Sequence, residues 1–149
     1  DDKEAVKWYR QAAEQGDAVA QYILGFMFQK GKGVTQGFNE AVKWFRQAAD
    51  QEDADAQFKL GSMYKSGKGV EQNFKEAAKW FRQAAEQEDA QAQFDLGDMY
   101  KNGQGVKQDL EEAAKWHQLA ADQGYTKAPP EDSAFTGDDA AASGFPGSS

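Results

Sequence analysis

Three glycine-rich stretches have a composition that can bind phosphate, because glycine lets backbone N–H groups approach an anion closely. They are GKGV at 31–34, GKGV at 67–70 and GQGV at 103–106. A nucleotide-binding loop of this type follows a β-strand, opens a helix and ends in Lys-Ser or Lys-Thr. Each stretch here follows a helical pattern and lacks that ending, so we predict structural turns and no bound nucleotide. The first glycine suits the left-handed end of a helix, and the second lets the chain reverse.

The only histidine, His117, is a candidate for acid–base chemistry. It occupies a position that is aromatic in every other copy of a repeated pattern, at Tyr9, Phe45 and Phe81. No Ser or Cys at a known spacing completes a nucleophilic site with it. We therefore interpret His117 as a partly buried substitute for an aromatic ring.

Asp95 and Asp98 lie three residues apart, on one face of a predicted helix, as a catalytic carboxylate pair or a hard-metal site would require. The other two copies have unrelated residues there, Ile23 and Phe26 in one and Lys59 and Ser62 in the other. Nothing nearby completes a ligand set. We favour a solvated acidic face and predict no metal and no cofactor. An enzyme, or an enzyme's regulatory subunit, that uses this acidic cluster is the less favoured alternative.

These positions all belong to a unit of 36 residues that occurs three times, at 17–52, 53–88 and 89–124. The tryptophans keep this period from one end of the array to the other: Trp8, Trp44, Trp80 and Trp116. The first 16 residues match the second half of a unit. The array is therefore three full 36-residue repeats preceded by half of another.

Each unit contains two amphipathic helical patterns of about 13–15 residues. The core side of the first is Ala20, Leu24, Met27 and Phe28, with Gly25 at its edge. The core side of the second is Phe38, Ala41, Val42, Phe45, Ala48 and Ala49. Trp44 lies at the margin of that side, and Lys43 and Arg46 lie on the opposite, solvated side. A single unit cannot bury these sides alone, so we predict an all-α solenoid in which neighbouring units stack.

The pattern A-x-x-x-L-G-x-x-Y/F-x-x-G-x-G-V, followed by E-A-x-K-W-x-x-x-A-A, resembles the Sel1-like repeat (SLR), a relative of the tetratricopeptide repeat. The resemblance covers residues 1–127. It implies antiparallel helix pairs stacked in a right-handed superhelix, with the first helix of each pair lining the concave surface. Family members are mostly bacterial or endoplasmic-reticulum adaptors that gather other proteins. This slightly favours a periplasmic or secreted bacterial protein and leaves the cytoplasm open. Some secreted members carry a disulfide in each repeat, a feature that cannot apply to a chain without cysteine.

Four positions of each first helix lie opposite its core side and change from copy to copy. They are Val19, Ile23, Phe26 and Lys30 in the first repeat, Asp55, Lys59, Ser62 and Ser66 in the second, and Gln91, Asp95, Asp98 and Asn102 in the third. They are bordered by an aromatic residue in every copy, Tyr22, Phe58 and Phe94. We call all these positions the variable face. It predicts a partner-binding groove, apolar toward the first repeat and acidic toward the third. The alternative is drift on an unconstrained surface.

Composition limits the partners. The net charge of −8 disfavours nucleic acid, because phosphate contacts need clustered Lys and Arg. No apolar run approaches the roughly 18 residues that span a bilayer. The chain begins inside a helical pattern without Met, so we expect a processed or trimmed product. Residues 128–149 hold four acidic and no basic residues among many small ones, which predicts a disordered tail that lies in a groove and permits self-association.

From these features we predict a non-catalytic adaptor that binds a protein or peptide in the groove lined by the first helix of each repeat. An architectural spacer within a longer repeat protein is the main alternative. The two hypotheses differ in whether the groove has a ligand.

Overall fold

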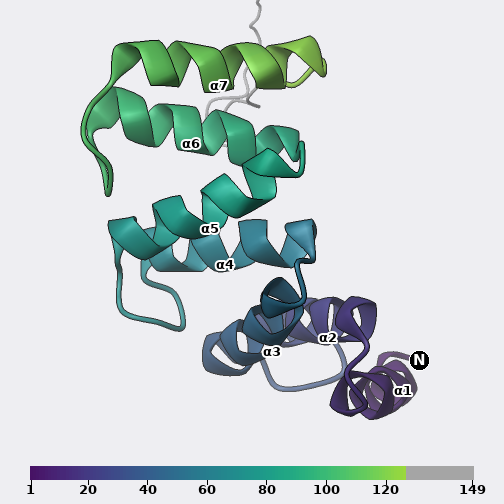
Figure 1. The fold of residues 1–149 in the computed structure, drawn as a ribbon. Helices are drawn as coiled ribbons and strands as arrows, with labels where there is room; N and C mark the ends of the chain where they lie inside the picture. The colour runs from purple at the N-terminus through teal and green to yellow at the C-terminus, as the bar shows by residue number, and fades with distance from the viewer. Residues whose placement is uncertain (127–149) are drawn as a thin grey trace, which may run out of the picture.

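The computed structural model describes residues 1–126, which form seven α-helices in an open array (Figure 1). The helices are α1 (Asp2–Glu14), α2 (Ala18–Lys30), α3 (Phe38–Asp50), α4 (Ala54–Ser66), α5 (Phe74–Glu86), α6 (Ala90–Asn102) and α7 (Leu110–Asp122). The tail predicted at 128–149 lies outside the described residues, so its contacts stay a prediction. None of the seven helices is both long and apolar enough to cross a bilayer.

Each helix packs mainly on the helix before it and the helix after it. The most extensive contacts join α2 with α3, α4 with α5 and α6 with α7, which are the two halves of each repeat. Helix α1 is the second helix of the half repeat and packs on α2. The predicted all-α class and the stacking of antiparallel helix pairs are confirmed.

The ends of the first helix are set by the same residue types in every repeat. In the second repeat, the Asp53 carboxylate accepts a hydrogen bond from the N–H of Ala56 at 2.9 Å and caps the start of α4. Gly67 ends that helix in the left-handed conformation, with φ of 76°. The first and third repeats have an Asp and a Gly with the same geometry. The predicted role of the first glycine of each GxGV stretch is confirmed.

The second glycine of each GxGV stretch also holds two repeats together. Gly69 has φ of 78°, and a Cβ on it would lie 2.5 Å from the carbonyl oxygen of Phe38, at the start of α3. Gly105 has the same relation to Phe74, at the start of α5, with a distance of 2.2 Å. Only a residue without a side chain fits so close to this backbone. The turn glycines therefore position the repeats, which accounts for them without a phosphate ligand.

The core follows the predicted sides of the helices. Leu24, Leu60 and Leu96 are fully buried at equivalent positions. The glycine in the middle of each first helix lets a ring approach: a Cβ on Gly61 would lie 2.9 Å from the ring of Phe81. These glycines therefore allow a close contact between the two helices of a repeat.

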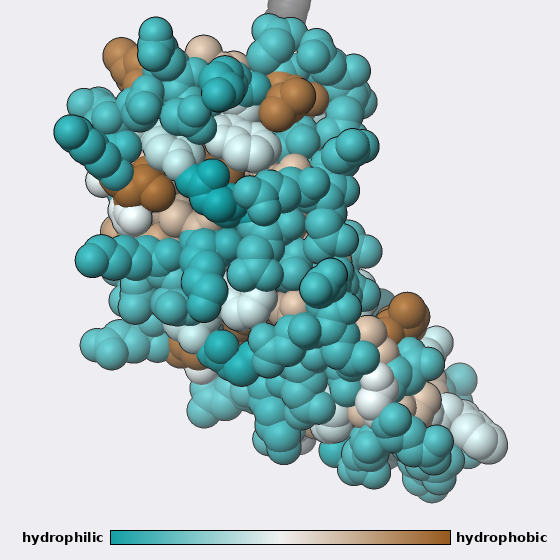
Figure 2. Space-filling view, viewed as in Figure 1, coloured by the Kyte–Doolittle hydropathy of each residue, from teal (hydrophilic) through white to brown (hydrophobic). Residues whose placement is uncertain are grey.

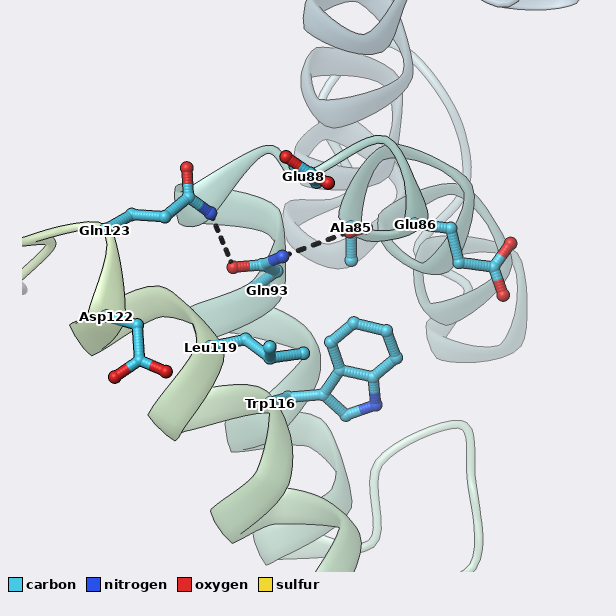
Figure 3. A pocket seen from close by; sticks show the side chains of 8 residues that line it. All are labelled: Ala85, Glu86, Glu88, Gln93, Trp116, Leu119, Asp122 and Gln123. Atoms are coloured by element: carbon cyan, nitrogen blue, oxygen red, sulfur yellow. Dashed lines mark hydrogen bonds between the residues drawn. The ribbon is translucent and has the colours of Figure 1, made fainter.

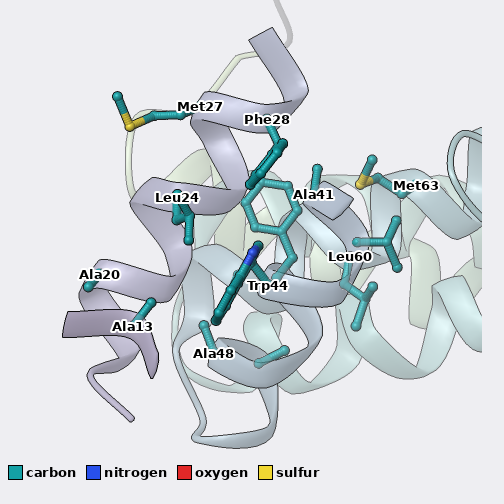
Figure 4. Packing of buried hydrophobic residues seen from close by; sticks show 14 of the residues in the cluster. Ala13, Ala20, Leu24, Met27, Phe28, Ala41, Trp44, Ala48, Leu60 and Met63 are labelled. Carbon is teal, nitrogen blue, oxygen red and sulfur yellow. The ribbon is translucent and has the colours of Figure 1, made fainter. Parts of the chain in front are cut away.

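The tryptophans differ from the prediction, because they are core residues and not marginal ones. Trp44 and Trp80 are only 4% and 5% exposed, and Trp44 lies among the side chains of the first core cluster (Figure 4). A helical projection considers one helix at a time, whereas this ring belongs to a cluster that extends from Val6 to Trp80. Trp8 has no such repeat beside it and is 65% exposed.

Candidate functional site

The variable face forms a row that is exposed at its ends and half-buried in its middle. Val19 and Lys30 are exposed, whereas Ile23 and Phe26 are half-buried and pack on the edge of the core. The second and third repeats show the same gradient from end to middle. On the side seen in Figure 2, hydrophilic residues cover most of the surface and hydrophobic residues form small separate patches. The half-buried side chains in the middle of the row lie partly on the surface and are not part of the core.

The bordering aromatic residues rest on rings from the second helix of the same repeat. The ring centroids are 5.7 Å apart for Tyr22 and Phe45, and 5.6 Å apart for Phe58 and Phe81. Burial raises the pKa of Tyr22 above its usual value, and the carboxylate of Asp55 raises it further. The Asp55 carboxylate of α4 thus lies close enough to act on Tyr22 of α2. The predicted aromatic border is present, and neighbouring repeats meet along it.

The second and third repeats enclose an open depression of about 520 Å³. Five residues of the variable face line it: Phe58, Ser62, Ser66, Gln91 and Asp95. Lys65, Phe81 and Tyr125 complete its walls. Tyr125 lies after α7 and was not predicted, because the prediction considered only helix faces. Its ring lies 5.5 Å from that of Phe94. The fold therefore brings residues from two repeats, predicted separately, into one concave surface.

At the other end of the variable face, three lysines surround one ring. The Nζ atoms of Lys30, Lys32 and Lys59 lie 5.7, 5.9 and 5.8 Å from the ring centroid of Phe26. Burial lowers the pKa of Lys59, and the charge of Lys30 lowers it further, against the opposing effect of Asp55. This end was predicted to be apolar, and it is both apolar and basic. The prediction missed the cluster because Lys32 lies in a turn and Lys59 comes from the next repeat.

The acidic end contains a side-chain pair that was not predicted. Asp98 Oδ1 lies 3.0 Å from His117 Nε2, and the two side chains are 23% and 29% exposed. The ring of His117 also lies 4.7 Å from that of Phe94. His117 thus takes the place of an aromatic residue as predicted, but the prediction of a solvated face is wrong for Asp98. Within residues 1–126, no three His, Asp or Glu side chains are placed so that they could hold a metal ion.

The arginines of the second helices are not solvated as predicted. The Arg46 guanidinium donates a hydrogen bond to the Tyr64 hydroxyl and lies 5.5 Å from the centre of that ring. Arg82 makes the same contacts with Tyr100. Each pair joins the second helix of one repeat to the first helix of the next. These arginines therefore hold the stack together.

A buried glutamine network, which the sequence reading missed, makes a second connection between repeats. Gln57 is 1% exposed and donates to the carbonyl oxygen of Ala49 at 3.3 Å and to Gln83 Oε1 at 3.2 Å. Its own Oε1 accepts a hydrogen bond from Gln87 at 2.9 Å. Gln21 has an equivalent set of bonds in the first repeat.

A family model for the Sel1 repeat matches residues 1–17, 18–53, 54–89 and 90–125. The chain belongs to the Sel1 repeat family. The four matched segments coincide with α1 and the three helix pairs, so the structural unit and the family unit are the same. A comparison with curated proteins finds no match.

Solved structures of other Sel1 repeat proteins are similar to this chain. A protective antigen present in uropathogenic Escherichia coli strains, which displays an SLR fold, is 43% identical with a TM-score of 0.82, over 84% of this chain and 27% of its own. A Sel1 repeat protein from Oxalobacter formigenes is also 43% identical, with a TM-score of 0.79, over 83% of this chain and 51% of its own. This chain therefore spans about half or less of the length of either relative.

Cysteine-rich protein B of Helicobacter pylori is similar in fold alone. It has 22% identity and a TM-score of 0.64, over 83% of this chain and 88% of its own. The present chain has no cysteine.

Proposed function

We propose that this Sel1 repeat chain is a non-catalytic adaptor that binds a peptide segment of a protein partner along the variable face. The observation that supports this most directly is the depression of about 520 Å³ between the second and third repeats. It combines aromatic walls, at Phe58 and Phe81, with the polar groups of Ser62, Gln91 and Asp95. Concave sites with apolar walls and a few polar groups are typical of peptide and ligand binding.

The charges along the variable face specify the chemistry of the partner. Lys30, Lys32 and Lys59 surround Phe26 at one end, and Asp95 and Asp98 lie toward the other. Complementary charge fixes the orientation of a bound segment and accelerates its association. The partner segment therefore has an acidic residue beside an apolar one at the Phe26 end and a basic residue at the opposite end.

Selection from a random peptide library tests this function. The full chain should enrich peptides with that order of charges, and Phe26→Asp should abolish their binding, because it removes the apolar contact and adds a carboxylate among the lysines. Fluorescence anisotropy with an enriched peptide measures the affinity.

Lys43→Asp is the matched control for the selected peptides. Lys43 lies over the ring of Trp44 at 5.6 Å, so it has a comparable aromatic contact on a second helix, away from the variable face. This variant should keep the full affinity. Peptides that bind Phe26→Asp as tightly as the original chain would show that the interface lies elsewhere, as an architectural spacer would predict.

A further inference from the structure

The boundary between the second and third repeats differs from the two earlier boundaries at one glutamine. Gln47 and Gln83 each accept a hydrogen bond from a buried glutamine of the first helix beside them. The equivalent residue of α7 is Leu119, which has no polar group and is 45% exposed. Gln93 accordingly keeps only two of the three bonds of this type, a donor bond to Ala85 and an acceptor bond from Gln123. The change places an apolar side chain on the outside of this boundary.

Leu119 lies in a pocket of about 390 Å³ on that boundary (Figure 3). Its apolar walls are Leu119, the indole of Trp116 and the methyl group of Ala85. Three carboxylate residues line it as well, Glu86, Glu88 and Asp122. None of these residues belongs to the variable face, so the pocket is distinct from the proposed groove. It offers apolar contact and negative charge together.

The earlier repeats show which chemistry suits the tryptophan of this pocket. Lys43 lies 5.6 Å from the ring of Trp44, and Lys79 lies 5.5 Å from the ring of Trp80. In the third repeat Lys115 instead forms an ion pair with Glu112 at 3.1 Å. Trp116 is also more exposed than the other two rings. In two repeats the tryptophan ring contacts a lysine of its own chain. In the third repeat the ring of Trp116 is thus available to a cation of another molecule.

We propose that this pocket binds an arginine side chain of a protein partner. The aliphatic part of arginine would pack on Leu119, its planar guanidinium would stack on the indole of Trp116, and the carboxylates would complement its charge. Arginine suits this combination better than lysine, because its guanidinium is planar and less strongly hydrated. Such a contact holds a partner on the outside of the array, independently of a peptide in the groove.

Nuclear magnetic resonance of the ¹⁵N-labelled full chain tests the proposal directly. The probe is the tripeptide acetyl-Gly-Arg-Gly-amide, and the control peptide has citrulline, a neutral isostere, in place of arginine. The indole N–H signal of Trp116 is identified by its loss in Trp116→Phe. We expect this signal to shift and saturate with the arginine peptide, with a dissociation constant on the order of millimolar. Equal shifts with the citrulline peptide would overturn the assignment to arginine. Tighter binding of a peptide that has lysine in place of arginine would overturn it as well.

The substitution Leu119→Gln restores the residue type that the other repeats have at this position. It should fold normally, which circular dichroism checks, and should weaken arginine binding about fivefold or more by replacing the apolar wall. Glu86→Gln should weaken binding as well, whereas Asp50→Asn, the equivalent change in the first repeat, should leave it unchanged. If Leu119→Gln folds and binds the arginine peptide as tightly as the original chain, the pocket is not the site.

Discussion

The second and third repeats have the same backbone plan but use different side chains on it. Helices α4 and α5 pack around Phe81, which is 1% exposed, whereas α6 and α7 meet at His117, which is half-buried and paired with Asp98. Arg82 of the second repeat bonds to Tyr100, while Gln118 at the equivalent position bonds to Asp122 of its own helix. The third repeat thus has polar contacts at two positions where the second repeat has a buried ring and a bond to the following helix.

The difference shows which residues the fold requires and which it leaves free. Both repeats keep the capping aspartate, the Leu-Gly pair, both turn glycines and the tryptophan. These residues set the helix ends and the distances between helices. The positions that changed include Phe81, which is His117 in the third repeat, and Gln83, which is Leu119 beside the outer pocket. The acidic end of the variable face comes from Asp95 and Asp98, in place of Lys59 and Ser62. New surface chemistry in the third repeat therefore arose at some expense of packing.

The largest expected effect compares the two ring positions. Phe81→Ala should lower the free energy of unfolding by about 3–5 kcal/mol, since it empties a fully buried site. His117→Ala should lower it by roughly 1–2 kcal/mol, because that ring is less buried and loses its bond to Asp98 and its contact with the ring of Phe94. Urea denaturation followed by circular dichroism measures both. Equal losses would mean that the third repeat is packed as tightly as the second.

The glutamine network gives the second comparison. Gln57→Leu removes three hydrogen bonds of a buried side chain and should cost about 1–3 kcal/mol. Gln93→Leu removes two such bonds, because Leu119 provides no third partner, so it should cost roughly 1 kcal/mol less. The same denaturation experiment applies. A greater loss for Gln93→Leu would contradict the idea that the network is weaker in the third repeat.

The smallest expected effect depends on pH and concerns Asp89, the cap of α6. Burial raises its pKa above the usual value, the N–H of Ala92 opposes this rise, and the charge of Asp55 adds to it. The folded state therefore holds this proton to a higher pH than the unfolded state, and stability declines as pH rises through the raised pKa. Asp89→Asn keeps a capping oxygen without the charge. Relative to the original chain, it should be more stabilising at pH 7 than at pH 3.

Asp55→Asn serves as the control for the pH effect. It removes a charge that raises the pKa of Asp89. In a chain that carries Asp55→Asn, the stabilising effect of Asp89→Asn should therefore differ less between pH 3 and pH 7. Thermal denaturation at the two pH values provides the comparison. A gain that is the same at both pH values would exclude an electrostatic origin.

The period and the amphipathic patterns were enough to predict the seven helices, the core leucines and the first glycine of each turn, because these depend on contacts within one helix pair. The residues that were missed act between repeats. Gln57 has an ordinary polar side chain for a helix, and only the preceding and following helices make it buried. Lys59 reaches Phe26 of another repeat, and Arg46 reaches Tyr64 on the next helix. A pattern along one helix carries no information on such distances.

The contact between the second glycine of each turn and the preceding second helix has a consequence for how such chains evolve. Removing residues 54–89 would place Gly105 over Phe38, which is the same contact that Gly69 makes now. A deletion that is not a whole number of repeats would shift Gly105 away from this contact. Gene duplication and loss in whole repeats therefore lengthen or shorten the array without a new interface. Each copy is then free to diverge in its surface residues, and selection can assign partners to repeats one at a time.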